Sequence, residues 1–487
     1  MVSDMNGKKP NILFVLTDDQ GPWAMRCAGN MDIHTPVLDA LAQRGVRFEN
    51  FFCASPVCSP ARASILTGRI PSAHGVHDWI RSGNLDRERL KEMGNDPYYT
   101  AEDKPIGYLD GMLTYTDVLS QNGYRCALAG KWHLGDSVRP QHGFEKWFTI
   151  GRGGCYYRRA DVVENGSVSF EDRYITDVIT EKALEYLDDL AQGEEPFYLS
   201  VHYTAPHDPW DEDQHPKEYV DLYRDCDFTA TPDLPVHPWQ IMTAPSGTGE
   251  RRKDLLRGYY AAVTAMDAAF GRILERLEEK GLAEETIVIF MADNGMNMGH
   301  HGIWGKGNGT FPFNFYDTAV KVPMIVSWKG HYPEGKVTDR LCSQYDIFQT
   351  LMDMTGIEAE LPADLPGKSF AGVFRGEEDG DGEVVVYDEY GPARMIRTKE
   401  WKYIHRIPYG PDELYHLTED ADEEVNLAGC EGYGEIAAEL KKRLTSWFWK
   451  YADPAVDAAR EGVTGFGQMC RPGIYSDREH TFCAMPK

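Results

Sequence analysis

The stretch NILFVLTDDQ, residues 11–20, shows the pattern from which the fold of this chain can be predicted. Residues 12–16 are a short apolar run that predicts a buried strand, and two carboxylates, Asp18 and Asp19, follow where the strand would end. Similar short apolar runs alternate with helical patterns along most of the 487 residues. This alternation favours an α/β protein with a central sheet flanked by helices.

Further strands are expected at residues 125–129, 196–203 and 286–292. Helical patterns cover residues 36–44, 115–122, 177–191, 253–280 and 346–354. Gly45, Gly123, Gly281 and Gly356 follow four of these patterns. Glycine is the usual residue of a left-handed helix C-cap, so we expect that conformation at all four.

The tract GVFRGEEDGDGE, residues 372–383, is acidic and glycine-rich and reads as a linker. It divides the chain into an expected larger domain, residues 1–375, and a smaller C-terminal domain, residues 376–487. The strand-like runs VVVYDEY and EWKYIHRI and a helical pattern near residues 436–451 predict a small antiparallel sheet plus a helix. Two long segments rich in Pro, Asp and Gly, residues 78–109 and 208–252, are expected as lids or binding loops.

Composition limits the partners of the chain. The formal net charge of −27 repels nucleic acid and anionic lipid, so neither is expected as a partner. There is neither an apolar run of about 20 residues, which a membrane span needs, nor a secretory signal. A cytoplasmic location is therefore the expectation.

The ten cysteines show no C-x-x-C pair, which argues against zinc and against a disulfide framework. The oligomeric state is not indicated.

Four predicted strands end in polar residues. They are followed by Asp18–Asp19, by Lys131 to His133, by His207–Asp208 and by Asp293–Asn294. Ligands of open α/β sheets bind beyond the carboxyl ends of the strands. We therefore expect these four ends to share one crevice.

The acidic pairs offer only oxygen ligands. Asp18, Asp19, Asp293 and Asn294 suit a hard divalent cation such as Ca²⁺ or Mg²⁺. The alternative is that adjacent acids after a strand cap a helix or solvate a turn. Two such pairs favour the cation, since clustered carboxylates without one would repel each other.

Five basic residues could hold an oxyanion near that cation. They are Arg62, Lys131, His133, His207 and Lys306, the last within the glycine-rich loop GHHGIWGKGNG. The alternative is a set of solvated surface charges.

Cys58 stands in the stretch CASPVCSPARASILTG, residues 53–68. Pro60 fits the first turn of a helix and Gly68 its end, so the thiol lies near a helix N-terminus, with Arg62 one turn on. Such a place favours an anion and suggests a thiolate nucleophile. A thiolate beside three carboxylates is unfavourable without a metal, however, and the C-x5-R pattern fails at Ser64. A buried structural cysteine is the other interpretation.

The motif CSPAR, followed by ASILTGRIPSAHGV, resembles the C-x-P-x-R signature of the type I sulfatases, which are arylsulfatase-like members of the alkaline phosphatase superfamily. Further segments resemble family segments in family order: NILFVLTDDQG, TPVLDALAQRGVRF, GYRCALAGKWHLG, TAPHDPW, IVIFMADNG, HGIWGKG, VPMIVSWKG and DIFQTLMDMTGI. The resemblance implies an alkaline-phosphatase-like, mostly parallel sheet flanked by helices, with a smaller C-terminal α+β domain.

The resemblance also implies a modified residue and a metal. A formylglycine-generating, or sulfatase-maturing, enzyme would oxidise Cys58 to formylglycine, which hydrates to a gem-diol. One divalent cation, usually calcium with magnesium as the alternative, would be held by four side chains and by formylglycine-58. Those side chains would be Asp18, Asp19, Asp293 and Asn294.

The mechanism that the resemblance implies assigns a role to each basic residue. The metal and Arg62 lower the pKa of one diol hydroxyl, which attacks sulfur. Lys131 and Lys306 disperse charge on the sulfuryl oxygens. His207, aided by Lys306, protonates the leaving oxygen, and His133 deprotonates the second hydroxyl to expel sulfate. The segment TIGRGGCYYRR, residues 149–159, does not align with family segments.

The resulting prediction is a sulfuric ester hydrolase acting on a small sulfated carbohydrate, because the acidic chain repels long polyanions. Alternatives are an aryl sulfate as the main substrate, a phosphonate monoester or phosphodiester hydrolase of the same superfamily, and binding of sulfated ligands without turnover. Several residues either stack on a sugar or simply pack loops onto the core: Tyr156, Tyr157, Arg158, Arg159, Trp210 and His215.

Overall fold

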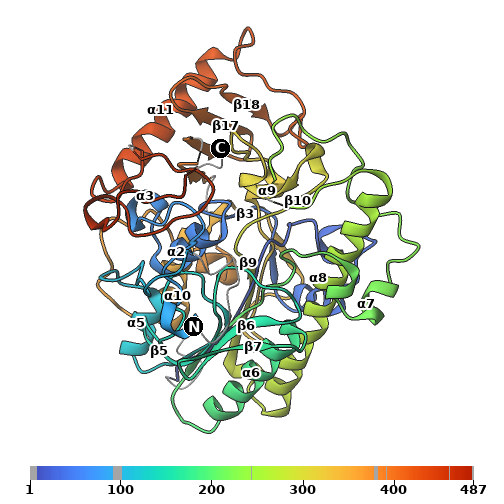
Figure 1. Ribbon diagram of the computed structural model, residues 1–487, viewed down its shortest axis with the longest axis vertical. Coiled ribbons are helices and arrows are strands. Elements are labelled where there is room, and N and C mark those ends of the chain that lie inside the picture. Colours follow the sequence, from blue (N-terminus) through green and yellow to red (C-terminus); the bar gives the residue numbers. More distant parts are fainter. Residues whose placement is uncertain are drawn as a thin grey trace.

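The computed structural model confirms an α/β protein built on one large sheet (Figure 1). It describes residues 8–90, 101–242, 244–377, 382–390, 392–459 and 461–484. The sheet has ten strands in the order β13-β2-β12-β9-β1-β8-β4-β5-β6-β7. Its centre is a parallel block made of β9 (Thr286–Ala292), β1 (Asn11–Thr17), β8 (Phe197–His202), β4 (Arg125–Lys131) and β5 (Phe144–Ile150).

The outer strands complete a mixed sheet. On one side β12 (Met324–Ser327) runs antiparallel to both β9 and β2 (Val46–Phe48), and β13 (Lys336–Thr338) is parallel to β2. On the other side β6 (Ala160–Glu164) and β7 (Ser167–Glu171) continue as an antiparallel pair. The parallel block is therefore central, where both of its faces can be covered.

Helices cover both faces of the sheet, and the alternation along β1 shows how. Leu13 and Val15 belong to an apolar cluster that includes side chains of α6 (Ile175–Leu190), α8 (Gly249–Glu279) and α1 (Pro36–Gln43). Their neighbours along the strand point to the other face, because successive strand side chains alternate. That face packs on α2 (Cys58–Thr67), α5 (Tyr115–Gln121) and α10 (Ile347–Thr355).

The predicted elements lie within a few residues of the observed ones, but one capping prediction was wrong. Gly123, Gly281 and Gly356 have positive φ angles of 90°, 71° and 65°, as predicted. Gly45 is not left-handed, and α1 ends at Gln43 with Arg44 as its C-cap. A Cβ on Gly45 would lie 2.4 Å from the carbonyl oxygen of Val326, so glycine is needed there because β12 comes so close.

A smaller α+β unit follows, as predicted. Its antiparallel sheet contains β15 (Val384–Asp388), β16 (Ala393–Arg397), β17 (Trp401–Arg406) and β18 (Glu413–His416), and α11 (Gly434–Tyr451) covers one face. Figure 1 shows this unit in orange and red at one end of the molecule. The domain limits at residues 375 and 376 stay a prediction.

The segments expected as linker and lids are only partly described. The linker, residues 372–383, begins inside the 3₁₀ helix η10 (Ala371–Arg375), and its residues 378–381 lie outside the described part. The same holds for residues 91–100 of one expected lid and for residue 243 of the other. The remaining α-helices and strands of the described part are α3 (Pro71–His74), α4 (Arg87–Leu90), α7 (Lys217–Asp221), α9 (Asp317–Val320), β3 (Phe51–Phe52), β10 (Asn297–Met298), β11 (Trp304–Gly305) and β14 (Cys342–Ser343).

Two exclusions from composition can be compared with the structure. None of the ten cysteines is part of a disulfide, and all of them lie in the described part of the chain. Among the described helices, none combines the length and the apolar character that crossing a bilayer requires.

Candidate active site

The structure brings the two predicted acidic pairs together at the carboxyl edge of the sheet. Strands β1 and β9 are parallel neighbours with Thr17 opposite Ala292, so the residues that follow them emerge side by side. The Asp19 amide donates to Asp293 Oδ1 at 3.2 Å. One carboxylate oxygen from each of three aspartates, Asp18, Asp19 and Asp293, lies within 4.8 Å of the others.

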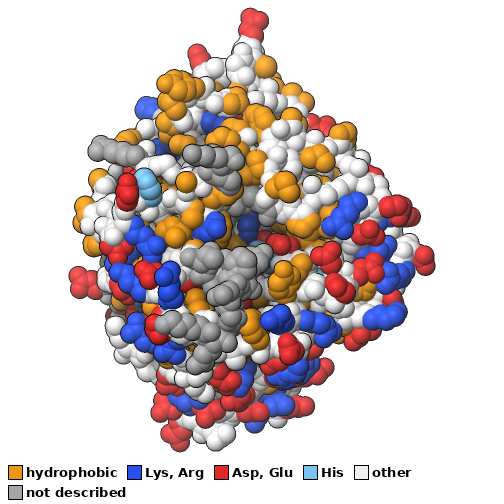
Figure 2. All heavy atoms as spheres, in the orientation of Figure 1, with side chains coloured by type: hydrophobic (Ala, Val, Ile, Leu, Met, Phe, Trp, Pro, Cys, Tyr) orange, Lys and Arg blue, Asp and Glu red, His pale blue; other side chains and the backbone are white. Residues whose placement is uncertain are grey.

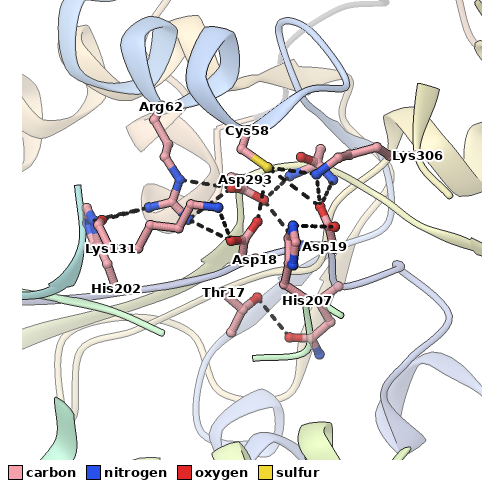
Figure 3. A network of polar contacts seen from close by, with 12 residues as sticks. Thr17, Asp18, Asp19, Cys58, Arg62, Lys131, His202, His207, Asp293 and Lys306 are labelled. Carbon is pink, nitrogen blue, oxygen red and sulfur yellow. Dashed lines mark hydrogen bonds and ion pairs between the residues drawn. The ribbon is translucent and has the colours of Figure 1, made fainter. Parts of the chain in front are cut away.

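Cys58 points into this acidic cluster from the first residue of helix α2 (Figure 3). Its Sγ lies 3.2 Å from Asp18 Oδ1 and 2.7 Å from Lys306 Nζ. Every residue of α2 is buried. Burial of the whole helix therefore holds residue 58, at its start, against the acidic cluster.

Arg62 lies one turn further along the same face of α2, because residues four apart are neighbours on a helix. Its Nε donates to Asp293 Oδ2 at 2.9 Å, and its Nη1 donates to the Lys131 carbonyl at 2.9 Å. The guanidinium thus joins α2 to the ends of β9 and β4. This arrangement holds Cys58 over the acidic cluster.

Two lysines complete the charge balance. Lys131, the last residue of β4, pairs with Asp18, and Lys306 Nζ lies 2.6 Å from Asp19 Oδ1. Together with Arg62 they place three cations against three carboxylates. Buried charges need such partners, since an unpaired ion away from water is strongly destabilising.

Two histidines flank the cluster and have different hydrogen-bond partners. His207 Nε2 is 3.7 Å from Asp19 Oδ2, while its Nδ1 donates to the Asp208 carbonyl at 2.9 Å. His133 Nε2 lies 3.1 Å from the carbonyl oxygen of Ile80. Because a carbonyl can only accept, the proton of neutral His133 belongs on Nε2. Its buried Nδ1 has no hydrogen-bond partner among the described residues and carries the lone pair.

The carboxylates differ in their pKa because their neighbours differ. Burial disfavours charge on Asp18, but the adjacent Lys131, His207 and Arg62 outweigh it and hold the pKa of Asp18 well below its usual range. Burial, together with the nearby Asp18, raises the pKa of Asp293 to about 6. Asp18 therefore stays charged, whereas Asp293 is protonated more easily. A bound cation would favour the charged form of both carboxylates.

The same environment sets the states of Cys58 and His133. Burial, with Asp18 as the next contribution, raises the pKa of the Cys58 thiol despite the two lysines. An unmodified Cys58 is therefore a thiol and a poor nucleophile. Burial, followed by the charges of Lys131 and Arg62, places the pKa of His133 well below its usual range, so this imidazole is neutral near pH 7.

The donor set fits a hard cation. Three carboxylates and one amide face each other, and the Oδ1 of Asn294 is buried without a hydrogen-bond partner in the described structure. The Asn294 amide nitrogen is already used, since it donates to Asp19 Oδ1 at 2.8 Å. A set made only of oxygen ligands suits Ca²⁺ or Mg²⁺ rather than zinc or copper.

Sequence reasoning missed two buried side chains beneath the site. Gln344 accepts from the Ala54 amide at 3.1 Å through Oε1 and donates to the Asp293 carbonyl at 2.6 Å through Nε2. His202 ends β8 and lies 2.9 Å from the Lys131 carbonyl through Nδ1. Burial, then the charge of Arg62, lowers the pKa of His202 to about 3. No local pattern marks either residue, because both contacts form only in the folded chain.

The unaligned segment, residues 149–159, reaches the two histidines through two glycines. A Cβ on Gly153 would lie 1.9 Å from His133 Nε2, whereas one on Gly154 would have its nearest neighbour, His207 Cε1, at 3.7 Å. In the sequence, the two adjacent glycines were the feature that could have indicated such a close approach of the backbone.

Half of the six predicted wall residues pack inward. Tyr157, Trp210 and His215 are buried, so the packing interpretation applies to them. Tyr156 is 53% exposed, and Arg158 and Arg159 are exposed as well. Figure 2 shows a hollow near the middle of this face, over the place where Figure 1 labels β3 and β9, with charged side chains inside it and apolar ones around it.

The fold and the site together define a class of protein. A mostly parallel α/β sheet whose carboxyl edge carries carboxylates, fixed cations and a helix-borne cysteine matches the expectation for a hydrolase of the alkaline phosphatase superfamily. The family model described as Sulfatase matches residues 10–357, and a second one, described as N-sulphoglucosamine sulphohydrolase, C-terminal, matches residues 299–449. The chain belongs to the sulfatase family, and it is a sulfatase, a hydrolase of sulfuric esters.

Curated relatives agree with this assignment. An ulvan-active sulfatase of Formosa agariphila is 28% identical over 90% of this chain and 81% of that protein. An N-acetylglucosamine-6-O-sulfatase of Bacteroides thetaiotaomicron is 26% identical over 92% of this chain and 87% of that protein.

Solved structures share the fold. A putative sulfatase from Bacteroides fragilis superposes with a TM-score of 0.74 at 25% identity, covering 92% of this chain and 97% of the other. A protein solved in complex with its substrate, D-glucosamine-2-N,6-O-disulfate, gives a TM-score of 0.74 at 23% identity, covering 92% and 99%.

Proposed function

We propose that this sulfatase releases inorganic sulfate from a small sulfated carbohydrate, with oxidised Cys58 as the nucleophile and one divalent cation, calcium in preference to magnesium, beside it. The observation that carries the proposal is the position of Cys58. Its Sγ lies within hydrogen-bond distance of both Asp18 and Lys306. A group at that position can face a bound oxyanion on one side and a cation on the other.

The environment of Cys58 supports its conversion to formylglycine. Cys58, Pro60 and Arg62 form the motif that the maturing enzyme of the family reads, and the surroundings disfavour a thiolate. A hydrated formylglycine would supply two hydroxyls on one carbon, one to attack sulfur and one to let sulfate leave. A sulfatase-maturing enzyme is therefore the expected partner of the newly made chain.

Asp18, Asp19, Asp293 and Asn294 are the side chains that would hold the cation, with residue 58 also within reach. The buried, unpartnered Oδ1 of Asn294 supports this assignment, since such an atom needs a partner. When bound, a divalent cation would supply charge stabilisation at the sulfate oxygens and acidity at the nucleophile.

The remaining side chains would bind sulfate and move protons. Lys131, Lys306 and Arg62 present cationic N–H groups that would hold and polarise the sulfate oxygens. His207 would protonate the leaving oxygen from Nε2, which faces the cluster and would have to carry the transferred proton, because Nδ1 is bonded to the Asp208 carbonyl. His133 would accept the proton that frees sulfate, because its Nδ1 is unpartnered within the described structure.

The names of the relatives support a carbohydrate as the substrate. The two relatives described above are named for activity on ulvan and on N-acetylglucosamine 6-sulfate, and one structural neighbour was solved with a disulfated glucosamine. The net charge of −27 disfavours approach of a long polyanion, so a mono- or disaccharide is the preferred substrate.

Sulfate release from a panel of sulfated monosaccharides, each carrying sulfate at one defined position, tests this function. We expect one position to give the highest kcat/KM, above both an aryl sulfate and an aryl phosphodiester. Faster hydrolysis of the aryl phosphodiester or of a phosphonate monoester would favour the phosphoryl alternative, and binding without release would favour the non-catalytic one.

A matched pair of lysine variants links that activity to the site. Lys306→Ala removes the cation beside Cys58 and should lower kcat/KM by about 100-fold. Lys329→Ala removes an exposed lysine that pairs with Glu278 and should leave kcat/KM unchanged. Equal effects of the two substitutions would contradict the assigned site.

A further inference from the structure

The last described part of the chain, residues 461–484, returns from the small unit to the catalytic one; we call it the C-terminal tail. Within this tail, Gln468 forms two backbone hydrogen bonds with the start of the expected lid, residues 78–109: the Gln468 amide donates to the Trp79 carbonyl at 2.8 Å, and the Arg81 amide donates to the Gln468 carbonyl at 2.9 Å. Figure 1 shows the dark red end of the chain lying beside α3. The tail thus adds a short parallel bridge to residues 77–81.

The side chain of Gln468 strengthens this contact. It is fully buried. Its Oε1 accepts from the His77 amide at 2.9 Å, and its Nε2 donates to the carbonyls of Gly75 and Cys470, both at 2.9 Å. One primary amide therefore joins the tail to Gly75 and His77, which directly follow α3.

Asp78 makes the reciprocal contact from the catalytic unit. Its carboxylate accepts from the Gly467 amide at 3.1 Å and from the Trp79 amide at 2.8 Å. Gly467 has a φ of 107°, and a Cβ there would lie 2.6 Å from Arg81 Cβ. The tail and residues 77–81 therefore pack closely, and hydrogen bonds from a side chain of each segment hold them together.

Ile80, within residues 77–81, contacts the active site through both its backbone amide and its backbone carbonyl. Its amide donates to Ser59 Oγ at 3.1 Å, next to Cys58 on helix α2. Its carbonyl accepts from His133 Nε2 at 3.1 Å. This second contact fixes the tautomer that leaves the lone pair of His133 on Nδ1.

We propose that the C-terminal tail is a positioning element of the active site, in which Gln468 holds residues 77–81 so that the Ile80 carbonyl orients His133. The inference rests on the proposed role of His133 as the base. Gln468 touches neither the reacting atoms nor the metal ligands, and it acts through the intervening segment.

The tail lies outside both matching family models. These end at residues 357 and 449, so the family match assigns no role to residues 461–484. The structure nevertheless places them two hydrogen-bonded steps from His133: one from Gln468 to the segment, and one from the segment to the imidazole.

Gln468→Met is the variant that tests this role, because methionine keeps the length and nearly the volume of glutamine while removing the amide. We expect kcat to fall by about 10- to 100-fold, since small misplacements of a catalytic group have effects of that size. KM should change by less than about threefold, because the sulfate-binding cations are untouched. Amide hydrogen exchange of residues 77–81 should become faster in the same variant.

The control is Leu444→Ala, which destabilises the small unit from a buried position of α11 without touching residues 77–81. It should leave kcat and the exchange of that segment as in the wild type. A Gln468→Met enzyme with wild-type kcat, or an equal loss in both variants, would overturn the proposal. If Gln468→Met does not fold, Asp78→Asn weakens the same contact from the other side and is judged by the same criteria.

The two readouts separate this inference from the proposed function. If the wild-type protein releases no sulfate from any panel substrate, the proposed function fails, and the exchange rates still test whether the tail holds residues 77–81. Unchanged exchange in Gln468→Met would overturn the positioning role even if the wild-type protein is active.

Discussion

At the scale of single residues, the two nitrogens of His133 explain how a buried imidazole can serve as a base. Nε2 is committed to a backbone carbonyl, and Nδ1 is the nitrogen that remains. Burial and the neighbouring cations hold the pKa of this histidine well below its usual range. The ring is therefore in its basic form over the whole physiological range.

A pH profile checks this state. Because the His133 pKa is depressed, its neutral form persists as pH falls, and kcat/KM should lose the contribution of this base only well below about pH 6.5, the ordinary histidine value. The measurement is kcat/KM from about pH 5 to about pH 8 for the wild type and for His133→Asn. An acid limb centred near about pH 6.5 that disappears in His133→Asn would contradict the assignment.

The adjacent glycines of the unaligned segment give a matched pair of substitutions. Gly153→Ala would place a Cβ 1.9 Å from His133 Nε2, so the ring must move, whereas Gly154→Ala makes only an ordinary contact of 3.7 Å. We expect kcat to fall by about 100-fold in the first variant and by less than about twofold in the second. Similar kcat values for the two variants would show that the imidazole position does not limit turnover.

A site residue could be predicted where the sequence around it carries a recognisable pattern. Asp18, Asp293 and Cys58 stand directly at the end of an apolar strand or the start of a helix, so their place in the fold followed from the pattern. Gln344 and His202 lie inside ordinary stretches and meet the site only through tertiary contacts. Their roles could not have been deduced without the structure.

At the scale of elements, Gln344 connects two parts that carry the site. It bonds the turn before α2 through the Ala54 amide and the end of β9 through the carbonyls of Ala292 and Asp293. The nucleophile helix and the metal-ligand strand thus share one buried amide. Their relative position depends on it.

Gln344→Ala should lower the free energy of unfolding by about 2–3 kcal/mol, because it leaves a buried N–H and two buried carbonyls with fewer partners. Urea denaturation measures the change. Gln192→Ala is the control: this exposed side chain makes one bond, to the Asp188 carbonyl, and its loss should cost less than about 0.5 kcal/mol. Equal stability of the two variants would contradict the connecting role.

The limits of helices and strands were predicted better than the structural roles of individual residues. The strand ending at Ala292 was predicted with its observed limits, because its apolar run is bounded by polar residues on both sides. Gly45 was assigned to a helix cap, although its actual constraint is the approach of β12. Such an approach involves residues about 280 positions apart along the chain, and no local pattern records it.

At the scale of the whole molecule, a buried charge cluster joins the small sheet to the catalytic unit. Lys402, in β17, is fully buried and pairs with Asp317 of α9 and with Glu423. These contacts bind the two units closely. The division at residue 375 stays a prediction, and limited proteolysis can test it.

The charge of the molecule predicts a dependence on ionic strength. Since the chain carries −27, a long sulfated polysaccharide should be hydrolysed slowly at about 10 mM salt and several times faster at about 200 mM, where repulsion is screened. A sulfated monosaccharide is the control and should change far less. A polysaccharide rate that falls as salt rises would mean that a basic cleft attracts the polymer, contrary to the preference for small substrates.

The central claim is that Cys58 acts as an oxidised residue rather than as a thiol. The measurement is the mass of the peptide containing Cys58, made with and without a sulfatase-maturing enzyme, alongside sulfate release by the same samples. We expect the mature peptide to be lighter by about 18 Da and the rate of sulfate release to rise in proportion to the converted fraction. Full activity in protein whose Cys58 is entirely unmodified would contradict the account.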